Sequence, residues 1–208
     1  MISVIVTCYN VAKYVEHCLD SIRTQSLPPN EIICVEDCST DNTLQILQAY
    51  HKRHPNTIRI VKHPENRGIG AARNTGVQAS TGDYLGFVDS DDFLHPDFFK
   101  ALYQNIVAFD ADIAYCRIKH QEAFKGSFVN FIHQPPKMQT CLLPNASNQG
   151  FAFSLHTIAP WSCLYKRSYL CEKIGPFPTI RFAEDVLPFL KRIVLANKIC
   201  FVADGKWS

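Results

Sequence analysis

Three carboxylates follow an apolar run in this sequence of 208 residues. The stretch GDYLGFVDSDDF (82–93) places Asp89, Asp91 and Asp92 within four positions. Clustered carboxylates repel one another unless a cation, hydrogen bonds or solvent offsets the repulsion. Mg²⁺ and similar cations bind few protein oxygens and complete their coordination from substrate, often from a diphosphate. The Asp-x-Asp spacing therefore indicates a divalent-metal site, built from Asp89 and Asp91, that holds a diphosphate.

Two other chemistries fit these carboxylates poorly, and a structural role stays open. A calcium loop of the EF-hand type that begins at Asp89 needs glycine at its sixth position and glutamate at its twelfth, where this chain has leucine and lysine. An aspartyl-phosphate phosphatase needs a nucleophilic aspartate after the first strand, where this chain has TCYN (7–10). Alternatively, one of the later two aspartates caps the helix predicted in HPDFFKALYQNI (95–106).

The carboxylates need a scaffold, and the apolar pattern predicts one. Continuous apolar runs, typical of strands that are covered on both faces, alternate with segments of helical spacing. This alternation indicates a right-handed, parallel α/β sheet with helices on its faces. The predicted strands are 2–7, 31–36, 57–63 and 83–88, and the predicted helices are 11–25, 39–53 and 69–80.

Polar residues gather where these strands end. Ligands of such sheets bind beyond the carboxyl ends of the strands, so three separate stretches would deliver polar side chains to one edge. Asn10 is also expected to cap the first helix, and capping of the following turn is an alternative role for Asp37. The polar residues expected at this edge are Thr7, Tyr9 and Asn10 after the first strand, Glu36 and Asp37 after the second, and Asp89, Ser90 and Asp91 after the fourth.

The stretch RGIGAARNTG (67–76) resembles a dinucleotide-binding glycine motif only weakly. Arg73 occupies its third glycine position, and the next strand leads to the aspartate cluster rather than to a lone ribose-binding acid. A glycine-rich helix start that carries an arginine still suits an anionic group, through backbone N–H groups and the guanidinium. We therefore expect Arg73 to contact the nucleotide, with a solvated surface position as the alternative.

The second half of the chain is less regular. Residues 119–150 are rich in turn-forming residues and are expected to form an inserted flap or loop excursion. Residues 160–170 predict a strand or turn, 183–196 a helix, and 198–203 a closing strand. Pro188 falls in the first turns of that helix, where its missing N–H is tolerated.

Composition argues against several classes of protein. The apolar content of 47% favours a packed domain, and the net charge of +2 gives no support for nucleic-acid binding. No apolar run approaches the roughly 20 residues of a membrane span, and Met1 leads directly into a strand without a signal-peptide pattern. The nine cysteines include no Cys-x-x-Cys pair, so we expect reduced thiols rather than zinc at Cys34 and Cys38. These features predict an intracellular, cytoplasmic protein.

Five motifs follow one another along the chain: ISVIVTCYN (2–10), VEDCSTDNT (35–43), NRGIGAARNTG (66–76), GDYLGFVDSDD (82–92) and FAEDVLPF (182–189). Together they resemble those of glycosyltransferase family 2, an inverting family with the GT-A fold. The resemblance covers residues 2–118 closely and 160–196 less closely. It implies one GT-A catalytic domain over 1–208, with an open, Rossmann-like, mixed but mostly parallel sheet flanked by helices. Residues 1–118 would form the nucleotide-sugar-binding half and 119–208 the acceptor-side half.

The resemblance also implies roles for individual residues. Thr7 and Tyr9 would line the base pocket, and Asp37 would hydrogen-bond the base. Asp89 would contact the ribose and share a Mn²⁺ or Mg²⁺ ion with Asp91. We group Asn10, Glu36, Arg73 and Ser90 with the nucleotide-binding residues.

Another set of residues would serve the acceptor. Asp185 matches the family's general base, and we place Glu184 and Trp161 on the acceptor side, where an aromatic face suits a sugar ring. Acids in a first helical turn are also common for stability alone, and a core position is the alternative for Trp161.

The activity implied is the inverting transfer of a single sugar from a nucleotide-sugar, most often a UDP-sugar. The acceptor would be a glycan or lipid-linked hydroxyl, as in cell-surface polysaccharide or lipopolysaccharide assembly. Glu36 and Cys38 depart from the family's usual Asp and Gly, which weakens the assignment of the nucleotide. The Gln-x-x-Arg-Trp motif of processive members is absent from these residues.

Two other functions remain as alternatives. A metal-dependent nucleotidyltransferase would normally carry a glycine-rich loop after its first strand, where TCYNVAKY (7–14) has no glycine. A non-catalytic binding module is disfavoured by the second acidic pair, Glu184 and Asp185. Contact with the cytoplasmic face of the inner membrane is expected only through residues beyond these 208.

Overall fold

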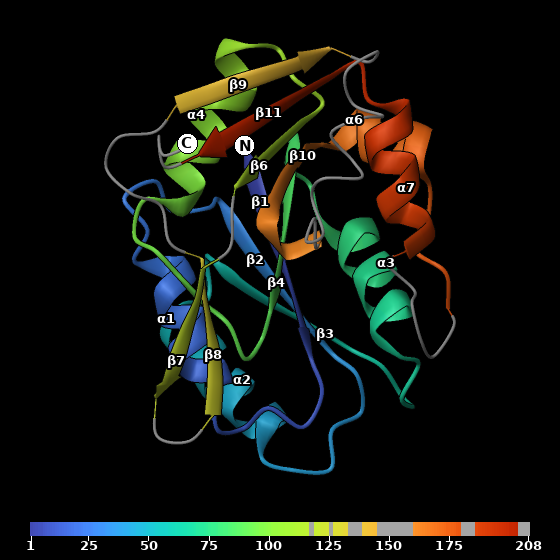
Figure 1. Cartoon of the computed structure of the whole chain (residues 1–208). Helices are drawn as coiled ribbons and strands as arrows, with labels where there is room; N and C mark the ends of the chain where they lie inside the picture. Colours follow the sequence, from blue (N-terminus) through green and yellow to red (C-terminus); the bar gives the residue numbers. More distant parts are fainter. Residues whose placement is uncertain (117–118, 125–126, 133–138, 145–159, 180–185, 204–208) are drawn as a thin grey trace.

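An eight-stranded sheet forms the centre of the described structure (Figure 1). The computed structural model describes residues 1–116, 119–124, 127–132, 139–144, 160–179 and 186–203. The strand order is β3-β2-β1-β4-β10-β6-β11-β9. The strands are β1 (Ile2–Cys8), β2 (Glu31–Glu36), β3 (Ile58–Lys62), β4 (Tyr84–Asp89), β6 (Ile113–Cys116), β9 (Gln139–Pro144), β10 (Cys163–Lys166) and β11 (Lys198–Ala203).

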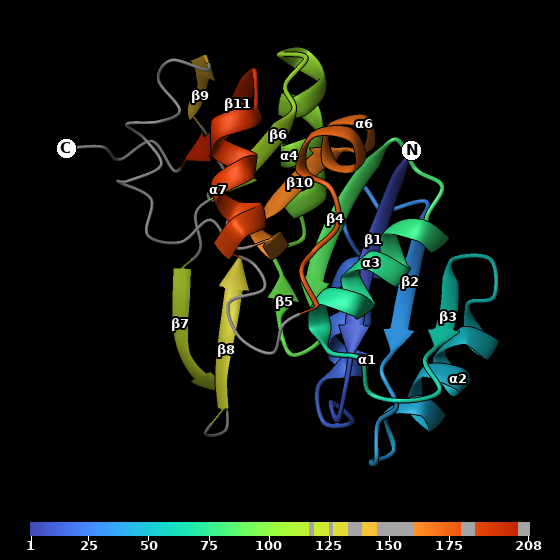
Figure 2. The same cartoon turned by 90° about the vertical axis from the view of Figure 1, so that its right-hand side faces the viewer.

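The first four strands form a parallel block, as the apolar runs predict. β1 lies between β2 and β4 and is parallel to both, and β3 is parallel to β2. Figure 2 shows these strands running in one direction, so their carboxyl ends meet at one edge. β10 is antiparallel to β4 and β6, β11 is parallel to β6, and β9 is antiparallel to β11. The open, mixed and mostly parallel sheet is thus confirmed.

Helices cover both faces of this sheet (Figure 1). Side chains of α1, α2 and α4 pack with one face, and those of α3, α6, η2 and α7 with the other. No helix in the described ranges is both long and apolar enough to cross a bilayer. The helices are α1 (Val15–Arg23), α2 (Thr43–Arg53), α3 (Ile69–Ala79), α4 (Phe98–Ala108), η1 (Pro160–Ser162), α6 (Arg167–Tyr169), η2 (Leu170–Ile174) and α7 (Val186–Leu195).

The alternation of side chains along β1 explains why its sequence is apolar throughout. Val4 and Val6 are fully buried in the core beneath α1 and α2, whereas Ile5 is fully buried on the opposite face. Gly76 of α3 lies directly over Ile5, and a Cβ at that position would overlap the Ile5 side chain. This glycine of the RGIGAARNTG stretch therefore allows the helix to approach the sheet closely.

Two helix starts differ from the predictions. α1 begins at Val15, and Asn10 does not cap it, because Asn10 lies in the loop before the helix with a φ of 54°. α4 begins at Phe98 after Asp97, so the cap role considered for Asp91 and Asp92 is wrong. Pro188 is the third residue of α7 as described, a position where the helix needs no N–H donor.

A second, three-stranded sheet stands next to the aspartate cluster. β5 (Phe93–Leu94) directly follows the cluster and pairs in parallel with β8 (Ser127–Ile132), which forms a hairpin with β7 (Lys119–Phe124) (Figure 2). The prediction of a turn-rich excursion over 119–150 is therefore wrong for these strands and for β9. β8 also pairs with β5, and β9 pairs with β11, partners that are distant in sequence; strand preference depends strongly on such tertiary context.

Candidate active site

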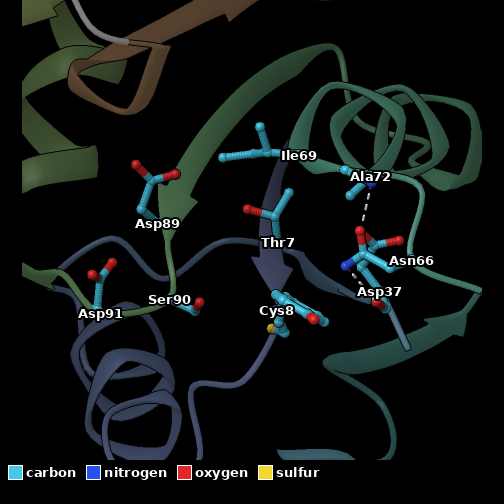
Figure 3. Close-up of a pocket in the computed structure, with 11 residues that line it drawn as sticks. Thr7, Cys8, Asp37, Asn66, Ile69, Ala72, Asp89, Ser90 and Asp91 are labelled. Carbon is cyan, nitrogen blue, oxygen red and sulfur yellow. Dashed lines mark hydrogen bonds between the residues drawn. The ribbon is translucent and has the colours of Figure 1, made fainter. Parts of the chain in front are cut away.

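A cavity of about 360 Å³ opens at the carboxyl ends of β1, β2 and β4 (Figure 3). Four chain segments line it: the ends of these three strands and the turn that leads into α3. Of the residues predicted from the sequence, Thr7, Tyr9, Asp37, Asp89, Ser90 and Asp91 are in its wall. The remaining lining residues are Cys8, Asn66, Gly68, Ile69 and Ala72.

Asp37 is the most tightly held carboxylate of this cavity. It is 2% exposed and follows β2 directly. Its Oδ1 accepts hydrogen bonds from His63 Nδ1 (2.6 Å) and Arg67 N (2.9 Å), and its Oδ2 accepts one from Gly68 N (2.8 Å). These three contacts hold the Asp37 carboxylate in one orientation at the wall of the cavity.

Sequence reasoning missed His63 and Asn66. Both lie in the segment after β3, and Asn66 donates from Nδ2 to the Asp37 backbone oxygen at 3.2 Å (Figure 3). The signal was present, because the rule that polar residues at strand ends gather at one edge also applies to HPEN (63–66) after the third strand. That strand end was left out of the predicted set.

Apolar side chains contribute to the wall of the same cavity. Tyr9 is 46% exposed and Ile69 is 36% exposed, although both are large apolar residues. A cavity that combines exposed apolar groups with a carboxylate suits a ligand that has flat faces and a polar edge.

Asp89 and Asp91 lie on the opposite side of the cavity from Asp37 and Asn66 (Figure 3). The backbone N–H of Asp92 donates to the Asp89 carbonyl at 3.0 Å, which closes a tight turn. This turn presents two carboxylates, of which Asp91 is exposed and Asp89 half-buried.

The donor set of this turn fits a hard divalent cation. Carboxylate oxygens are the ligands that Mg²⁺ and Mn²⁺ prefer. Within the described ranges, no group of three or more His, Cys, Asp or Glu side chains gathers as a metal site. A cation at Asp89 and Asp91 would therefore need oxygens from a ligand, and the phosphates of a nucleotide would provide them.

Arg73 lies behind the cavity wall. It is 3% exposed, and its guanidinium lies 3.4 Å from Asp89 Oδ1 and 5.5 Å from the centre of the Phe177 ring. Because Arg73 is buried, the alternative of a solvated surface position is wrong. Arg73 is also absent from the lining residues, which does not favour the expected direct contact with a nucleotide. The placement favours an indirect role, in which Arg73 orients Asp89 and offsets part of its charge.

Glu36 and Asn10 also lie outside the lining residues. Glu36 is 1% exposed and accepts a hydrogen bond from Ser39 N at 2.5 Å, while Asn10 Oδ1 accepts one from Thr40 N at 2.8 Å. Both side chains thus shape the loop after β2. Cys38 in this loop has a φ of 59°, a conformation that favours glycine.

The acceptor-side residues fall outside the described part of the chain. This applies to Asp185 and Glu184, and to the side chain of Trp161, whose backbone belongs to η1. Their predicted roles stay predictions.

The cysteines close to the cavity are buried thiols. A hydrogen bond with Cys34 and burial raise the pKa of the Cys8 thiol well above its ordinary value. Burial likewise raises the pKa of Cys18. These side chains therefore stay protonated and are poor nucleophiles.

Comparison with known proteins agrees with this geometry. The family described as "Glycosyl transferase family 2" matches residues 3–170. Uncharacterized glycosyltransferase EpsJ of Bacillus subtilis is 35% identical over 193 residues, which cover 89% of this chain and 54% of that protein. Poly(ribitol-phosphate) beta-N-acetylglucosaminyltransferase TarS of Staphylococcus aureus is 30% identical over 206 residues, covering 97% of this chain and 34% of TarS.

Solved structures of glycosyltransferases are also similar to this chain. A crystal structure of S. aureus TarS superposes with a TM-score of 0.79 at 28% identity, covering 99% of this chain and 58% of the TarS chain. TarS in complex with UDP-GlcNAc matches with a TM-score of 0.78 at 27% identity, covering 99% of this chain and 56% of the TarS chain.

The fold is that of a GT-A α/β protein. Within that class, the chain belongs to glycosyltransferase family 2. It spans 54%, 29% and 58% of the lengths of the first three curated relatives that it matches.

Proposed function

We propose that this chain is the catalytic GT-A domain of an inverting glycosyltransferase that moves a single hexosyl or N-acetylhexosaminyl group from a UDP-sugar. The acceptor is a hydroxyl of a glycan or lipid-linked molecule. The observation that carries the proposal is the single cavity in which Asp37 faces Asp89 and Asp91 across the sheet edge. One side suits a base, and the other suits a metal-bound diphosphate.

The base side supports a uracil nucleotide. Asp37 accepts from the imide N–H of the base, while Tyr9 and Thr7 form the adjoining wall. The solved TarS complex with UDP-GlcNAc, a structural neighbour at 27% identity, supports the same ligand class. Glu36 and Asn10 act by holding the loop after β2 rather than by contact with the nucleotide.

The diphosphate side supports a role for a divalent cation. Asp91 and Asp89 would hold Mn²⁺ or Mg²⁺, which when bound offsets the negative charge of the leaving diphosphate. We assign the contact with the ribose to Asp89 and Ser90, and their position in the cavity wall supports this assignment. Arg73 orients Asp89 from behind the wall.

The transfer itself needs one base on the acceptor side. Asp185 takes the proton of the acceptor hydroxyl, whose oxygen attacks the anomeric carbon. The bond between that carbon and the phosphate oxygen breaks, its electron pair leaves with UDP, and the anomeric configuration inverts. A positioned carboxylate suffices for this proton transfer.

The two halves of the chain divide the work. Residues 1–118 bind the donor, and 119–208 serve the acceptor, with Trp161 and Glu184 as contacts. The pairing of β5 with β8 supports this division, because it attaches the second half directly to the aspartate turn. We propose a cytoplasmic location, with any contact at the inner membrane made by further residues.

Calorimetry of nucleotide binding tests the proposal. UDP should bind in Mn²⁺ and lose affinity in EDTA or in Asp91→Ala. Asp83→Ala is the matched control, because Asp83 is exposed at the opposite end of β4 and pairs with the N-terminal ammonium at 2.9 Å. Equal UDP affinity of Asp91→Ala and the wild type in Mn²⁺ would exclude the metal assignment.

A screen of donors tests the reaction class. Wild-type protein should hydrolyse at least one of UDP-glucose, UDP-N-acetylglucosamine and GDP-mannose slowly in Mn²⁺. Release of pyrophosphate from a nucleoside triphosphate and a sugar phosphate, without turnover of any nucleotide-sugar, would instead support a nucleotidyltransferase.

A further inference from the structure

A buried hydrogen-bonded chain stands behind the cavity, and the proposed function leaves it without a role. His63 directly follows β3 and is 3% exposed. Its Nδ1 lies 2.6 Å from Asp37 Oδ1, and its Nε2 lies 2.9 Å from Thr75 Oγ1. The imidazole thus links the carboxylate in the cavity wall to α3, which covers the sheet.

The partners determine the direction of the first hydrogen bond. An ionised carboxylate only accepts hydrogen bonds, so Nδ1 of His63 carries the proton that lies between it and Asp37. The hydroxyl of Thr75 can either donate or accept. Its contact with Nε2 therefore fixes the plane of the ring whichever tautomer or charge the histidine adopts.

The contacts of Asp37 leave one carboxylate oxygen more open than the other. Oδ1 accepts from both His63 and Arg67, whereas Oδ2 accepts from Gly68. Each carboxylate oxygen can accept about two hydrogen bonds. Oδ2 is therefore the atom with capacity for an N–H donor of a ligand, and the bonds at Oδ1 set the direction in which Oδ2 points.

We propose that His63 is a positioning residue that makes the cavity selective for uracil over cytosine. The inference rests on the proposed function, since it takes Asp37 to meet the base. N3 of uracil carries a hydrogen that Oδ2 of an ionised Asp37 accepts, whereas N3 of cytosine carries a lone pair that this oxygen repels. A site built around one hydrogen bond discriminates strongly against a ligand that cannot form it.

The loss of His63 would weaken this discrimination through the orientation of Asp37. Without the Nδ1–H donor at Oδ1, the Asp37 carboxylate can rotate away from the orientation that suits the base. Oδ2 then no longer points at the N3–H of uracil, so the preference for uracil falls.

Two substitutions separate the functions of the two ring nitrogens. The amide nitrogen of Asn lies roughly where Nδ1 lies, so His63→Asn keeps a donor for Asp37 and loses the contact with Thr75. The amide of Gln reaches toward Nε2, so His63→Gln keeps the contact with Thr75 and loses the donor. We expect His63→Gln to weaken UDP binding about 10- to 100-fold, with CDP binding little changed, and His63→Asn to recover most of the preference.

His51→Gln is the matched control. His51 lies on α2, away from the cavity, and its Nδ1 makes a 2.6 Å hydrogen bond with the Ile58 carbonyl. Its replacement should lower the melting temperature without changing the ratio of UDP to CDP affinity. In turnover assays, His63→Gln should raise the donor KM and leave kcat near wild type.

Calorimetry with UDP and CDP in Mn²⁺ is the measurement that decides. If folded His63→Gln keeps the wild-type ratio of UDP to CDP affinity, whether both affinities stay the same or fall equally, the inference is overturned. If His63→Gln does not fold, ¹⁵N NMR of the histidines in the wild-type protein without nucleotide provides the test. Nδ1 of His63 should carry a proton and change its shift in Asp37→Asn, and an unprotonated Nδ1 would overturn the inference.

The same experiments distinguish the failure of the inference from failure of the proposed function. Wild-type protein that binds no nucleotide would refute the proposed function, even if NMR finds the hydrogen bond between His63 and Asp37. Wild-type protein that prefers UDP, together with His63→Gln that keeps this preference, would refute only the role of His63.

Discussion

Replacement of Asp37 by Asn changes little in shape and much in hydrogen bonding. The wild-type carboxylate accepts from three donors: His63, the Arg67 amide and the Gly68 amide. Asn has a single acceptor oxygen, and its NH₂ group must occupy the other position. The structure therefore allows two orientations of the Asn side chain, and each has a defined cost.

In one orientation, the NH₂ group takes the position of Oδ2 and faces the Gly68 N–H. In the other, it takes the position of Oδ1 and faces the Arg67 N–H, although His63 can adapt by changing its tautomer. Either way one partly buried backbone donor loses its acceptor, which costs about 1–3 kcal/mol. For a domain of this size the melting temperature should fall by about 2–12 °C.

The effect on the ligand should be separate from the effect on stability. Loss of the ionised acceptor should weaken UDP binding by about 1–3 kcal/mol, which corresponds to about 5- to 150-fold in Kd. Differential scanning calorimetry measures the loss of stability, and isothermal titration with UDP in Mn²⁺ measures the loss of affinity. Unchanged UDP affinity in folded Asp37→Asn would remove Asp37 from the base pocket.

Asp41→Asn is the control that makes this result specific. Asp41 lies in the same loop, and its carboxylate accepts from Ala12 N (3.0 Å), Thr43 N (2.9 Å) and Thr43 Oγ1 (2.5 Å). It is not in the wall of the cavity. Its replacement should lower stability without a loss of UDP affinity. An equal loss of affinity in both variants would mean that loop disorder, and not a lost base contact, is the cause.

Three further predictions concern other parts of the chain. Asp185→Asn should lower transfer by about 10²- to 10⁴-fold in a product-release assay, while UDP affinity stays near wild type; near-normal turnover would exclude it as the base. Asn74 of α3 forms two 2.8 Å hydrogen bonds with the backbone of Phe177. Asn74→Ala should therefore lower the free energy of unfolding, measured in urea, by about 1–3 kcal/mol. A smaller decrease would mean that α3 and the segment around Phe177 stay together without these bonds. Partial burial opposes ionisation of Glu31, but hydrogen bonds, led by that from Ser3, outweigh it and lower its pKa. Its contribution to stability is therefore present above its unfolded pKa and lost as pH falls through the lower folded pKa. Glu31→Gln should be less stable than wild type at pH 7, and the difference should disappear in acid; a difference that stays constant as the pH is lowered would contradict this.

The donor side of the site could be predicted because local pattern determines it. Buried strands appear in the sequence as continuous apolar runs, and parallel strands bring their carboxyl ends to one edge. Polar residues after β1, β2 and β4 were therefore expected to meet, and they line one cavity. Their chemical roles stay predictions, because residue type and placement alone do not identify a ligand.

The direction of a side chain was harder to predict than its position in the chain. Successive side chains in extended chain point to opposite sides, so Glu36 and Asp37 could not both face the cavity, and the structure has Asp37 there. Helical spacing similarly explains why Arg73 does not line the cavity. Ile69 and Ala72 line the cavity from α3, and Arg73 lies further round the same buried face, where a charged group needs a partner and meets Asp89.

The small sheet of β5, β7 and β8 shows why the second half resisted prediction and what this means for the enzyme. β5 consists of Phe93 and Leu94 only, so no periodicity in the sequence could reveal it, and its partner β8 lies at Ser127–Ile132. Yet these two residues connect the aspartate turn to the hairpin through backbone pairing, which depends weakly on side-chain identity. If the hairpin serves the acceptor as proposed, its side chains can change to suit a different acceptor while the turn that presents Asp89 and Asp91 stays in place. Leu94→Pro removes the N–H with which β5 donates to Ser21 Oγ at 3.2 Å. By displacing β5, this substitution should weaken UDP binding in calorimetry, and unchanged UDP affinity would contradict the reasoning.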